Sequence, residues 1–316
     1  MVSDTGRLPA FAHAAHHGRH MLTKPKPSLG DWIAGARPRT LPAAVVPVAV
    51  GTGAAIGTDG VDVVWWRVVI ALVVSLLLQI GVNYANDYSD GVRGTDDVRV
   101  GPMRLVASGT ASPSAVKKAA LACLGLAALA GLALAVATSW WLILVGLAAI
   151  LAAWGYTGGP KPYGYLGLGE LFVFTFFGLV ATVGTTYVAI EHVPWVTWPA
   201  ACGVGFLACA LLVVNNLRDI PTDTGSGKRT LAVRLGDHAT RVLYVALVTG
   251  AIVLAVVCAF DRTWSLLAVL ASAVAVVPVR RVLSGATGRD LIAVLGATGK
   301  VQLAYGALLT LGLALA

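Results

Sequence analysis

The sequence predicts an all-α integral membrane protein, and three observations lead to this class. Of the 316 residues, 57% are hydrophobic and only 12% are charged, and the mean hydropathy is +0.80, whereas soluble domains carry about 25% charged residues. Apolar runs of about 20 residues, the length that spans a bilayer, recur along the chain. Lys and Arg residues gather on alternate connecting segments. A soluble helical bundle of this composition would lack the polar surface needed to stay dispersed.

Nine apolar runs are predicted to form transmembrane helices, because a backbone in hydrocarbon must satisfy its own hydrogen bonds. The first run is short and contains Pro42 and Pro47, which leaves its start open. Residues 1–30 are expected to form a disordered basic arm, and residues 31–316 a single transmembrane domain. The predicted spans are 41–58, 64–87, 114–137, 140–156, 168–190, 196–217, 239–260, 263–281 and 290–315.

The distribution of basic residues predicts that the amino terminus is cytoplasmic. With that orientation, all of the 23 Lys and Arg residues except Arg67, Arg262 and Lys300 lie on inside segments, as the positive-inside rule requires. The net charge of +8 therefore reflects topology and contact with anionic lipid of the cell membrane. It does not indicate a nucleic-acid partner, because the charge is spread over separate loops.

Carboxylates and amides gather where the second predicted helix leaves the membrane, in NYANDYSDGVRGTDD, residues 83–97. At 100° per residue, two amides and two carboxylates at the end of this helix fall within about 100° of one another. Clustered carboxylates repel unless a cation lies between them, and hard oxygen ligands suit Mg²⁺. Simple solvation of a helix end would favour Lys or Arg on this face instead. The clustered residues are Asn83, Asn86, Asp87 and Asp90, and the following loop adds Asp96 and Asp97.

The sixth predicted helix ends in a similar way, in NNLRDIPTDTGSGKRT, residues 215–230. Asn215, Asp219 and Asp223 are spaced four residues apart and therefore share one helical face. The second and sixth helices thus end in matching polar patches on the cytoplasmic side. Metal ions on the carboxylates and basic side chains on phosphate oxygens would together hold a diphosphate. The basic candidates are Arg93, Arg104, Lys161, Lys228 and Arg229.

The motifs NDYSD, NNLRDIPTD and GKRT resemble those of the UbiA-type intramembrane prenyltransferases, and the resemblance covers residues 31–316. It implies nine transmembrane helices around a central cavity, in which paired Asp-rich motifs hold Mg²⁺ and a prenyl diphosphate. One departure is Gly94, which occupies the position of the family's third aspartate in the first motif, so that Asp96 is expected to take that role. The implied catalytic residues are Asp87, Asp90, Asp219 and Asp223, and the implied metal ligands are these four with Asn86, Asp96 and Asn215.

Within this family, ARPRTLP, NDYSDGVRGTDD, GPMRL and YTGGPKPYGYLGLGE look most like the branch that prenylates 1,4-dihydroxy-2-naphthoate. That branch implies transfer of a polyprenyl group from a polyprenyl diphosphate, with loss of CO₂ and diphosphate, to give demethylmenaquinone. Arg37 or Arg39 would either bind the carboxylate of the acceptor or mark the inner end of the first helix. Tyr156 either lines the acceptor pocket or belongs to an interfacial aromatic belt. Asn83 is a further candidate on the acceptor side.

Other functions compete with this one. A cation-coupled transporter would use the acidic residues as a cation path, but transporters bind substrate near the bilayer midplane, whereas these acids lie at helix ends on one side. Within the family, the alternative acceptors are 4-hydroxybenzoate, homogentisate and a chlorin. The sequence leaves open the roles of Gln79, Glu170 and Lys300, which are polar residues within predicted spans.

Overall fold

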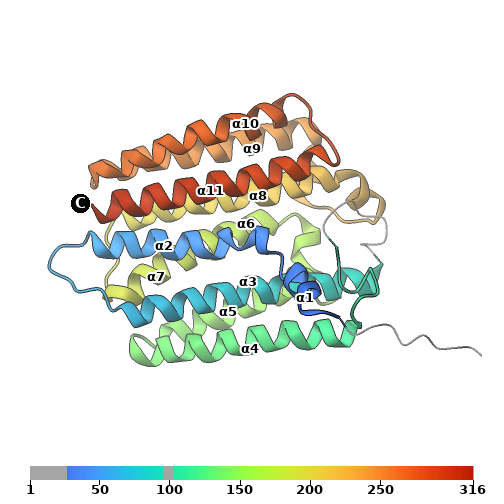
Figure 1. The fold of residues 1–316 in the computed structure, drawn as a ribbon, viewed down its shortest axis with the longest axis horizontal. Coiled ribbons are helices and arrows are strands. Elements are labelled where there is room, and N and C mark those ends of the chain that lie inside the picture. Colours follow the sequence, from blue (N-terminus) through green and yellow to red (C-terminus); the bar gives the residue numbers. More distant parts are fainter. Residues whose placement is uncertain (1–26, 95–102, 316) are drawn as a thin grey trace, which may run out of the picture.

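The structure is a computed structural model that describes residues 27–94 and 103–315. This part of the chain is helical and contains no strand, and its long helices run side by side along one axis (Figure 1). The helical segments are α1 (Leu29–Gly35), η1 (Pro38–Thr40), α2 (Pro42–Ile56), α3 (Trp65–Arg93), α4 (Pro113–Ala137), α5 (Trp141–Gly155), η2 (Tyr163–Leu166), α6 (Gly169–Val173), η3 (Phe174–Val180), α7 (Ala181–Ile190), α8 (Thr197–Gly225), α9 (Leu231–Cys258), η4 (Thr263–Leu270), α10 (Ala271–Leu283) and α11 (Asp290–Ala314).

Within the described residues, seven helical segments are long and apolar enough to cross a membrane. The bent pair Leu29–Thr40 and Pro42–Ile56 is a candidate for an eighth span, and the apolar helix α5 is shorter than a full span. Each predicted run therefore coincides with a helical segment, with α6, η3 and α7 joining into one of them. The all-α membrane class is confirmed, whereas a count of nine spans stays a prediction.

Helices α3 and α8 extend past the ends of their apolar runs and carry the acidic clusters, as the helical spacing of the polar residues predicts. The apolar pattern predicts ends at residues 87 and 217, whereas the helices continue to Arg93 and Gly225 and have 29 residues each. At 1.5 Å per residue each is about 43 Å long, which exceeds the roughly 30 Å of a hydrocarbon core. The last turns therefore reach the polar interface, where carboxylates are less costly. Helix α3 stops at Gly94, which adopts a left-handed conformation (φ 70°) that glycine tolerates.

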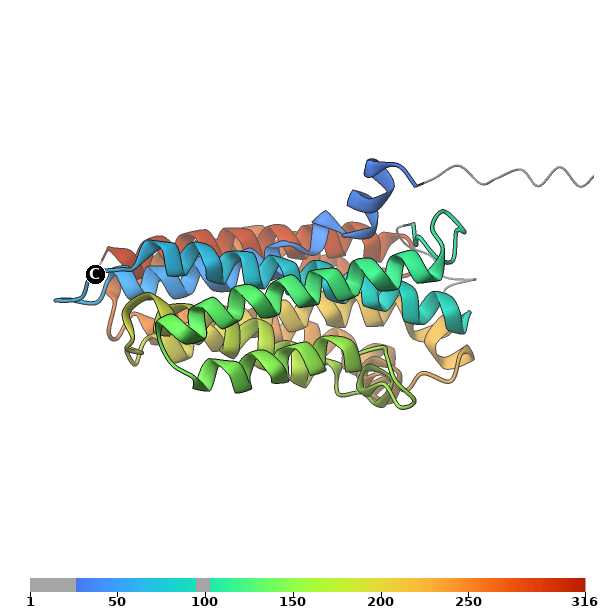
Figure 2. The same ribbon diagram turned by 90° about the horizontal axis from the view of Figure 1, so that it is seen from below.

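A bend between α1 and α2 forms one side of the end of the bundle that carries the clusters. The two segments meet at 53°, and Arg37 adopts a left-handed conformation (φ 54°) directly before Pro38. Asn83 Nδ2 donates to the carbonyl oxygen of Ala36 at 2.9 Å and to Thr40 Oγ1 at 3.0 Å. These bonds hold the bend against α3, while α1 projects from the bundle (Figure 2).

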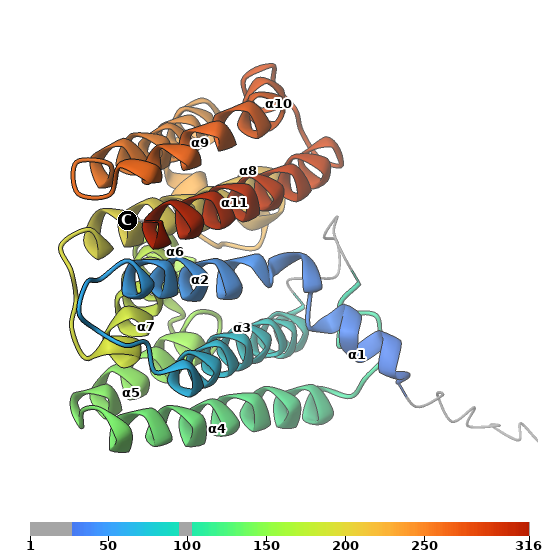
Figure 3. The same ribbon diagram turned by 60° about the vertical axis from the view of Figure 1, so that its left-hand side comes forward.

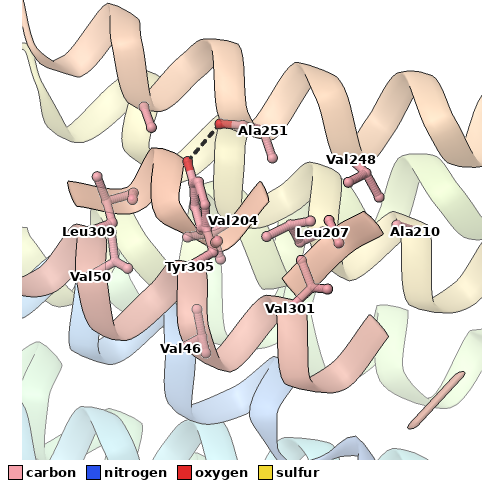
Figure 4. Packing of buried hydrophobic residues seen from close by; sticks show 14 of the residues in the cluster. Val46, Val50, Val204, Leu207, Ala210, Val248, Ala251, Val301, Tyr305 and Leu309 are labelled. Atoms are coloured by element: carbon pink, nitrogen blue, oxygen red, sulfur yellow. Dashed lines mark hydrogen bonds between the residues drawn. The ribbon is translucent and has the colours of Figure 1, made fainter. Parts of the chain in front are cut away.

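The main hydrophobic core lies between α2, α8, α9, α10 and α11. Helix α2 stands between α11 and α3 (Figure 3), so it links this core to the other half of the bundle. In the core, the fully buried Tyr305 of α11 donates its hydroxyl hydrogen to the carbonyl oxygen of Ala251 in α9 at 3.0 Å (Figure 4). Glycines allow close approach, as where Gly53 of α2 faces the backbone of Thr310 in α11. Such contacts hold membrane helices together by van der Waals packing.

Exposed tryptophans concentrate at the end of the bundle opposite to the acidic clusters. At this end Arg67 forms an ion pair with Glu191 (2.7 Å) and donates to the carbonyl oxygen of Ala137 at 2.9 Å, which joins α3 to the ends of α4 and α7. Tryptophan rings in this position anchor a protein at the membrane–water interface. The exposed rings are Trp65, Trp66, Trp140, Trp141, Trp195, Trp198 and Trp264.

Replacing Gly53 by Ala tests the close approach of α2 to α11. A Cβ atom at this position would lie 2.5 Å from the carbonyl oxygen of Thr310, and a backbone atom cannot swing aside. We expect Gly53→Ala to lower the melting temperature in detergent, in line with the roughly 1–3 kcal/mol that overpacking costs. Gly125→Ala is the matched control, because nothing lies within 4 Å of a Cβ there. Equal melting temperatures for the two variants would contradict this packing.

Candidate active site

A cavity of about 880 Å³ lies between the helix ends that carry the two acidic clusters. Its walls come from the α1–α2 bend, the end of α3, residues 103–108, the connection after α5, the end of α8 and the start of α11. The fold therefore brings two clusters that are distant in the sequence to one chamber. The predicted site residues on its wall are Arg37, Arg39, Asn83, Asn86, Asp90, Arg104, Tyr156, Asn215, Asp219, Asp223 and Lys228.

Asp90 is buried in the cavity wall among groups that stabilise its negative charge. Its Oδ1 accepts hydrogen bonds from Tyr165 Oη at 2.6 Å and from Lys228 Nζ at 3.3 Å. Its Oδ2 lies 3.7 Å from Arg104 Nη2. Burial lowers the pKa of Lys228, but the opposing negative charge, above all that of Asp90, raises it further, so the net shift is upward. Lys228 is therefore a cation at neutral pH.

Asp219 pairs with the residue directly before it. Arg218 Nε donates to Asp219 Oδ1 at 2.6 Å, and Arg218 Nη2 donates to Asp219 Oδ2 at 2.7 Å. The same Nη2 donates to Asn215 Oδ1 at 2.8 Å. One turn further along α8, Asp223 also lines the cavity, and its carbonyl oxygen accepts a hydrogen bond from the Lys228 backbone N–H at 2.9 Å. That bond brings Lys228 back over the end of α8.

Asp87 is the predicted catalytic residue that the structure does not place on the cavity wall. Its Oδ2 accepts a hydrogen bond from the Leu105 N–H at 2.8 Å, and its Oδ1 accepts one from the Val106 N–H at 3.0 Å. The side chain is completely buried. Asp87 therefore fixes the segment that carries Arg104, and it influences the chamber through that segment.

Three of the five basic residues predicted to bind a diphosphate also lie off the cavity wall. Arg93 donates from both terminal nitrogens to the carbonyl oxygens of Thr157 and Gly159, so it secures the connection after α5. The side chains of Lys161 and Arg229 are exposed. All three belong to segments whose neighbouring residues do reach the cavity. Position in the sequence alone therefore does not separate the basic residues on the cavity wall from those that lie off it.

The four residues predicted on the acceptor side line the cavity in different ways. Arg37 and Arg39 come from the α1–α2 bend. Asn83 uses its amide group to hold that bend, so it positions the two arginines. Tyr156 stands between this cavity and an adjacent apolar pocket.

The adjacent apolar pocket has a volume of about 210 Å³ and lies between α3, α4, α5 and the segment from α6 to α7. Aromatic rings stack along its wall, since the ring centroids of Tyr163 and Phe172 are 3.9 Å apart. A molecule with a charged end and a hydrocarbon chain thus finds both environments side by side. The residues that line both the pocket and the polar cavity are Val82, Tyr156, Val173 and Phe177.

The site contains polar residues that the sequence analysis does not assign. From the sequence, Arg218 is expected only as a basic residue on an inside segment, although an arginine beside an acidic helix face is a natural partner for it. Asn216 lines the cavity and donates from Nδ2 to Glu170 Oε1 at 3.0 Å. Among the described residues, Glu170 Oε2 is buried without a hydrogen-bond partner. Tyr165, which the sequence places with Tyr156 either at the acceptor pocket or in an interfacial aromatic belt, lines the cavity and donates a hydrogen bond to Asp90.

The cavity wall supplies the kind of ligand that Mg²⁺ prefers, which is oxygen from carboxylates and amides. Among the described residues, no three His, Cys, Asp or Glu side chains are grouped closely enough to hold a metal ion. The type of donor fits Mg²⁺, but in this structure Asp90 and Asp219 are paired with basic side chains. Asp96, the expected third carboxylate of the first cluster, lies outside the described residues. The oxygen donors on the wall are Asn86, Asp90, Asn215, Asp219 and Asp223.

The fold and the cavity define a multi-pass helical membrane protein with a polar chamber beside an apolar pocket. The chain belongs to the UbiA prenyltransferase family, which matches residues 44–295. It is 52% identical over 278 residues to the 1,4-dihydroxy-2-naphthoate octaprenyltransferase of Mycobacterium tuberculosis, covering 88% of this chain and 94% of that protein. It is 41% identical over 239 residues to the protein of the same name in Escherichia coli, covering 70% of this chain and 74% of that protein.

Solved structures share the fold. A UbiA homologue from Archaeoglobus fulgidus bound to GPP and Mg²⁺ has a TM-score of 0.64 at 17% identity, covering 88% of this chain and 99% of that chain. The apo structure of a UbiA homologue from Aeropyrum pernix K1 has a TM-score of 0.67 at 15% identity, covering 84% and 96%. At this level of identity the likeness concerns the fold alone, and it confirms the predicted UbiA-like architecture.

Asp87→Ala should loosen the segment that carries Arg104. The variant loses the acceptors of the Leu105 and Val106 N–H groups, and a hydrogen bond to a charged group contributes about 1.5–3 kcal/mol. We expect faster amide hydrogen exchange in a peptide that covers residues 103–111, measured by mass spectrometry in detergent. Asp223→Ala serves as the control and should leave that exchange unchanged. If both variants exchange like the parent protein, Asp87 does not position this segment.

Proposed function

We propose that the chain transfers a polyprenyl group from a polyprenyl diphosphate to 1,4-dihydroxy-2-naphthoate. CO₂ and diphosphate are released, and the product is the reduced, hydroquinone form of demethylmenaquinone. One observation carries the proposal: a chamber lined by two acid–amide clusters and by basic side chains adjoins an apolar pocket and shares wall residues with it. The relatives named 1,4-dihydroxy-2-naphthoate octaprenyltransferase in Mycobacterium tuberculosis and Escherichia coli support the choice of acceptor.

The diphosphate of the donor belongs between the two acidic clusters, with Arg104 and Lys228 among its contacts. Both side chains line the chamber beside Asp90. Mg²⁺ held by the carboxylate and amide oxygens of the wall would add positive charge next to the diphosphate. As the bond between C1 and oxygen of the donor breaks, negative charge grows on the leaving diphosphate. Fixed positive groups in a partly water-excluded chamber stabilise that charge.

The apolar pocket suits the hydrocarbon end of the donor. Tyr156 and Phe177 stand where this pocket meets the polar chamber, so the allylic carbon would lie against their rings. Exclusion of water at this boundary protects a carbocation-like transition state from hydrolysis. Because the pocket is small, a longer polyprenyl chain would continue into the surrounding lipid.

The acceptor belongs on the side of the α1–α2 bend. Arg37 and Arg39 line the chamber there, and a guanidinium group binds a carboxylate through two parallel hydrogen bonds. The ring carbon that bears the carboxylate forms a bond to C1 of the donor. The bond from that ring carbon to CO₂ then breaks, and its electron pair returns to the ring, which restores the aromatic system.

In this proposal the chamber faces the cytoplasm and the protein lies in the cell membrane. All but three of the 23 Lys and Arg residues fall on the inside segments, and the acidic clusters lie at the end opposite to the exposed tryptophans. The donor would stay in the bilayer while the soluble acceptor arrives from the cytoplasm. Cation-coupled transport fits less well, because the acidic residues of the chamber gather towards one end of the bundle.

Purified protein with Mg²⁺, a radiolabelled polyprenyl diphosphate and a panel of aromatic acceptors tests the proposed reaction. We expect the label to move to 1,4-dihydroxy-2-naphthoate with release of CO₂, and EDTA to stop the reaction until Mg²⁺ is restored. Transfer to 4-hydroxybenzoate, homogentisate or a chlorin instead would overturn the proposed acceptor. A failure to prenylate any of the four would overturn the reaction itself.

The basic residues of the wall should act on the donor. Lys228→Ala or Arg104→Ala removes a positive charge beside the leaving diphosphate, and we expect a loss of roughly 2–4 kcal/mol of transition-state stabilisation, about 30- to 1,000-fold in rate. Lys161→Ala is the matched control, because Lys161 is exposed and lies off the wall, and it should keep nearly the full rate. Arg37→Ala should instead raise the KM of the acceptor. If Lys228→Ala weakens only the acceptor, the two ends of the chamber are assigned the wrong way round.

A further inference from the structure

A buried arginine, Arg218, is hydrogen-bonded to one of the two carboxylates of the second acidic cluster, that of Asp219. Arg218 binds both oxygens of Asp219 at 2.6 and 2.7 Å, and it also binds the side-chain oxygen of Asn215 at 2.8 Å. Only 3% of its side chain is exposed, and the residue lies on the cavity wall. Two of the proposed metal ligands on α8 are therefore held by one cation that belongs to the chain itself.

Asp90 of the first acidic cluster is paired in a comparable way, with cations from other segments. Lys228 lies 3.3 Å from Asp90 Oδ1, and Arg104 lies 3.7 Å from its Oδ2. A buried carboxylate without a counter-charge is strongly destabilising, so these pairs allow the chamber to exist without its ligands. A metal ion must then compete with Arg218 for the oxygens of Asp219, because both would bind at the same atoms.

We propose that Arg218 is a diphosphate-binding residue that Asp219 holds in reserve until the donor and the metal ion bind together. This inference rests on the proposed function. The guanidinium group of Arg218 can donate two parallel hydrogen bonds to two phosphate oxygens as well as to a carboxylate. When Arg218 turns to the diphosphate, Asp219 and Asn215 become available to Mg²⁺.

The exchange is favourable only when both ligands are present. A metal ion alone would displace Arg218 and separate a buried guanidinium from the Asp219 carboxylate, and a diphosphate alone would draw Arg218 away and remove the two hydrogen bonds that it donates to Asp219. Each ligand therefore raises the affinity for the other by the same factor, since such coupling is reciprocal. A chamber that holds neither ligand binds each of them weakly.

Binding of Mn²⁺ alone to the full-length protein in detergent tests the first half of this inference. Mn²⁺ accepts the same oxygen ligands as Mg²⁺, and its bound fraction is measured by electron paramagnetic resonance. We expect Arg218→Gln to bind Mn²⁺ about tenfold more tightly than the parent protein, within the range usual for coupled sites. Arg39→Gln removes a charge from the same wall and controls for long-range electrostatics, so it should change the affinity far less.

A second control concerns the loss of a buried arginine as such. Arg241 forms a similar fork with Asp237, at 2.6 and 2.8 Å, and does not line the cavity. Arg241→Gln should therefore leave Mn²⁺ binding unchanged. If Arg241→Gln and Arg218→Gln tighten Mn²⁺ binding equally, the effect is general loosening of the fold and the inference fails.

Binding of inorganic diphosphate in the presence of EDTA, measured by calorimetry, tests the second half. Asp219→Asn keeps the shape of the side chain but releases its hold on Arg218, so we expect diphosphate to bind about tenfold more tightly than to the parent protein. The double variant Asp219→Asn, Arg218→Gln should lose that gain. A gain that persists in the double variant, or equal Mn²⁺ affinity of Arg218→Gln and the parent, would overturn the inference. These measurements use no acceptor and no turnover, so their outcome is independent of the acceptor panel.

Discussion

The burial of acidic side chains in an apolar helical bundle is the constraint on which the rest of the structure depends. A carboxylate removed from water must find donors or a cation, and each buried aspartate of α3 and α8 does so differently. Asp87 accepts hydrogen bonds from two backbone N–H groups, and Asp90 accepts them from Tyr165 and Lys228. Asp219 accepts hydrogen bonds from the neighbouring Arg218. Because the donors to Asp87 and Asp90 belong to the segments that connect the helices, the bonds that stabilise these two buried acids also define walls of the chamber.

The two acidic clusters are alike in composition but not in construction. The cluster on α8 is assembled locally, since Arg218, Asp219 and Asn215 lie within five consecutive residues of one helix. The cluster on α3 depends on distant segments, since Lys228 follows α8 and Tyr165 follows α5. The bonds among Arg218, Asp219 and Asn215 can therefore form within the helix itself, whereas those of Asp90 form only when the segments after α5 and α8 have packed against α3.

The class of fold and the location of the chamber could be predicted because both depend on patterns within single segments. Hydropathy fixes the helices, and the amide–carboxylate spacing fixes their polar faces. The apolar runs end at residues 87 and 217, but the helical spacing of the polar residues that follow them predicts that both helices continue, and they reach Arg93 and Gly225. Only the bundle shows that these polar turns face inward, where they find partners.

The rotation of each helix against its neighbours could not be predicted either. At 100° per residue, Asp87 lies about 40° to one side of Asn83, while Asp90 and Asn86 lie about 20° and 60° to the other side. A polar stripe of that width meets two neighbours, and packing alone decided that Asp87 faces residues 105 and 106 rather than the cavity. The direction of Lys161, which lies in a connection, has no periodicity from which to be predicted.

The tryptophans at the far end of the bundle fix the distance of the chamber from the membrane interface at that end, not from the nearer interface. Rings such as Trp65 and Trp198 stand at the starts of α3 and α8, so the excess length of these two helices appears entirely at their other ends. A bilayer that is a few ångströms thicker or thinner changes how far those ends protrude, and membrane proteins respond to such mismatch by tilting or by deforming the lipid. Bilayer thickness therefore sets the level of the chamber relative to the plane of the lipid headgroups.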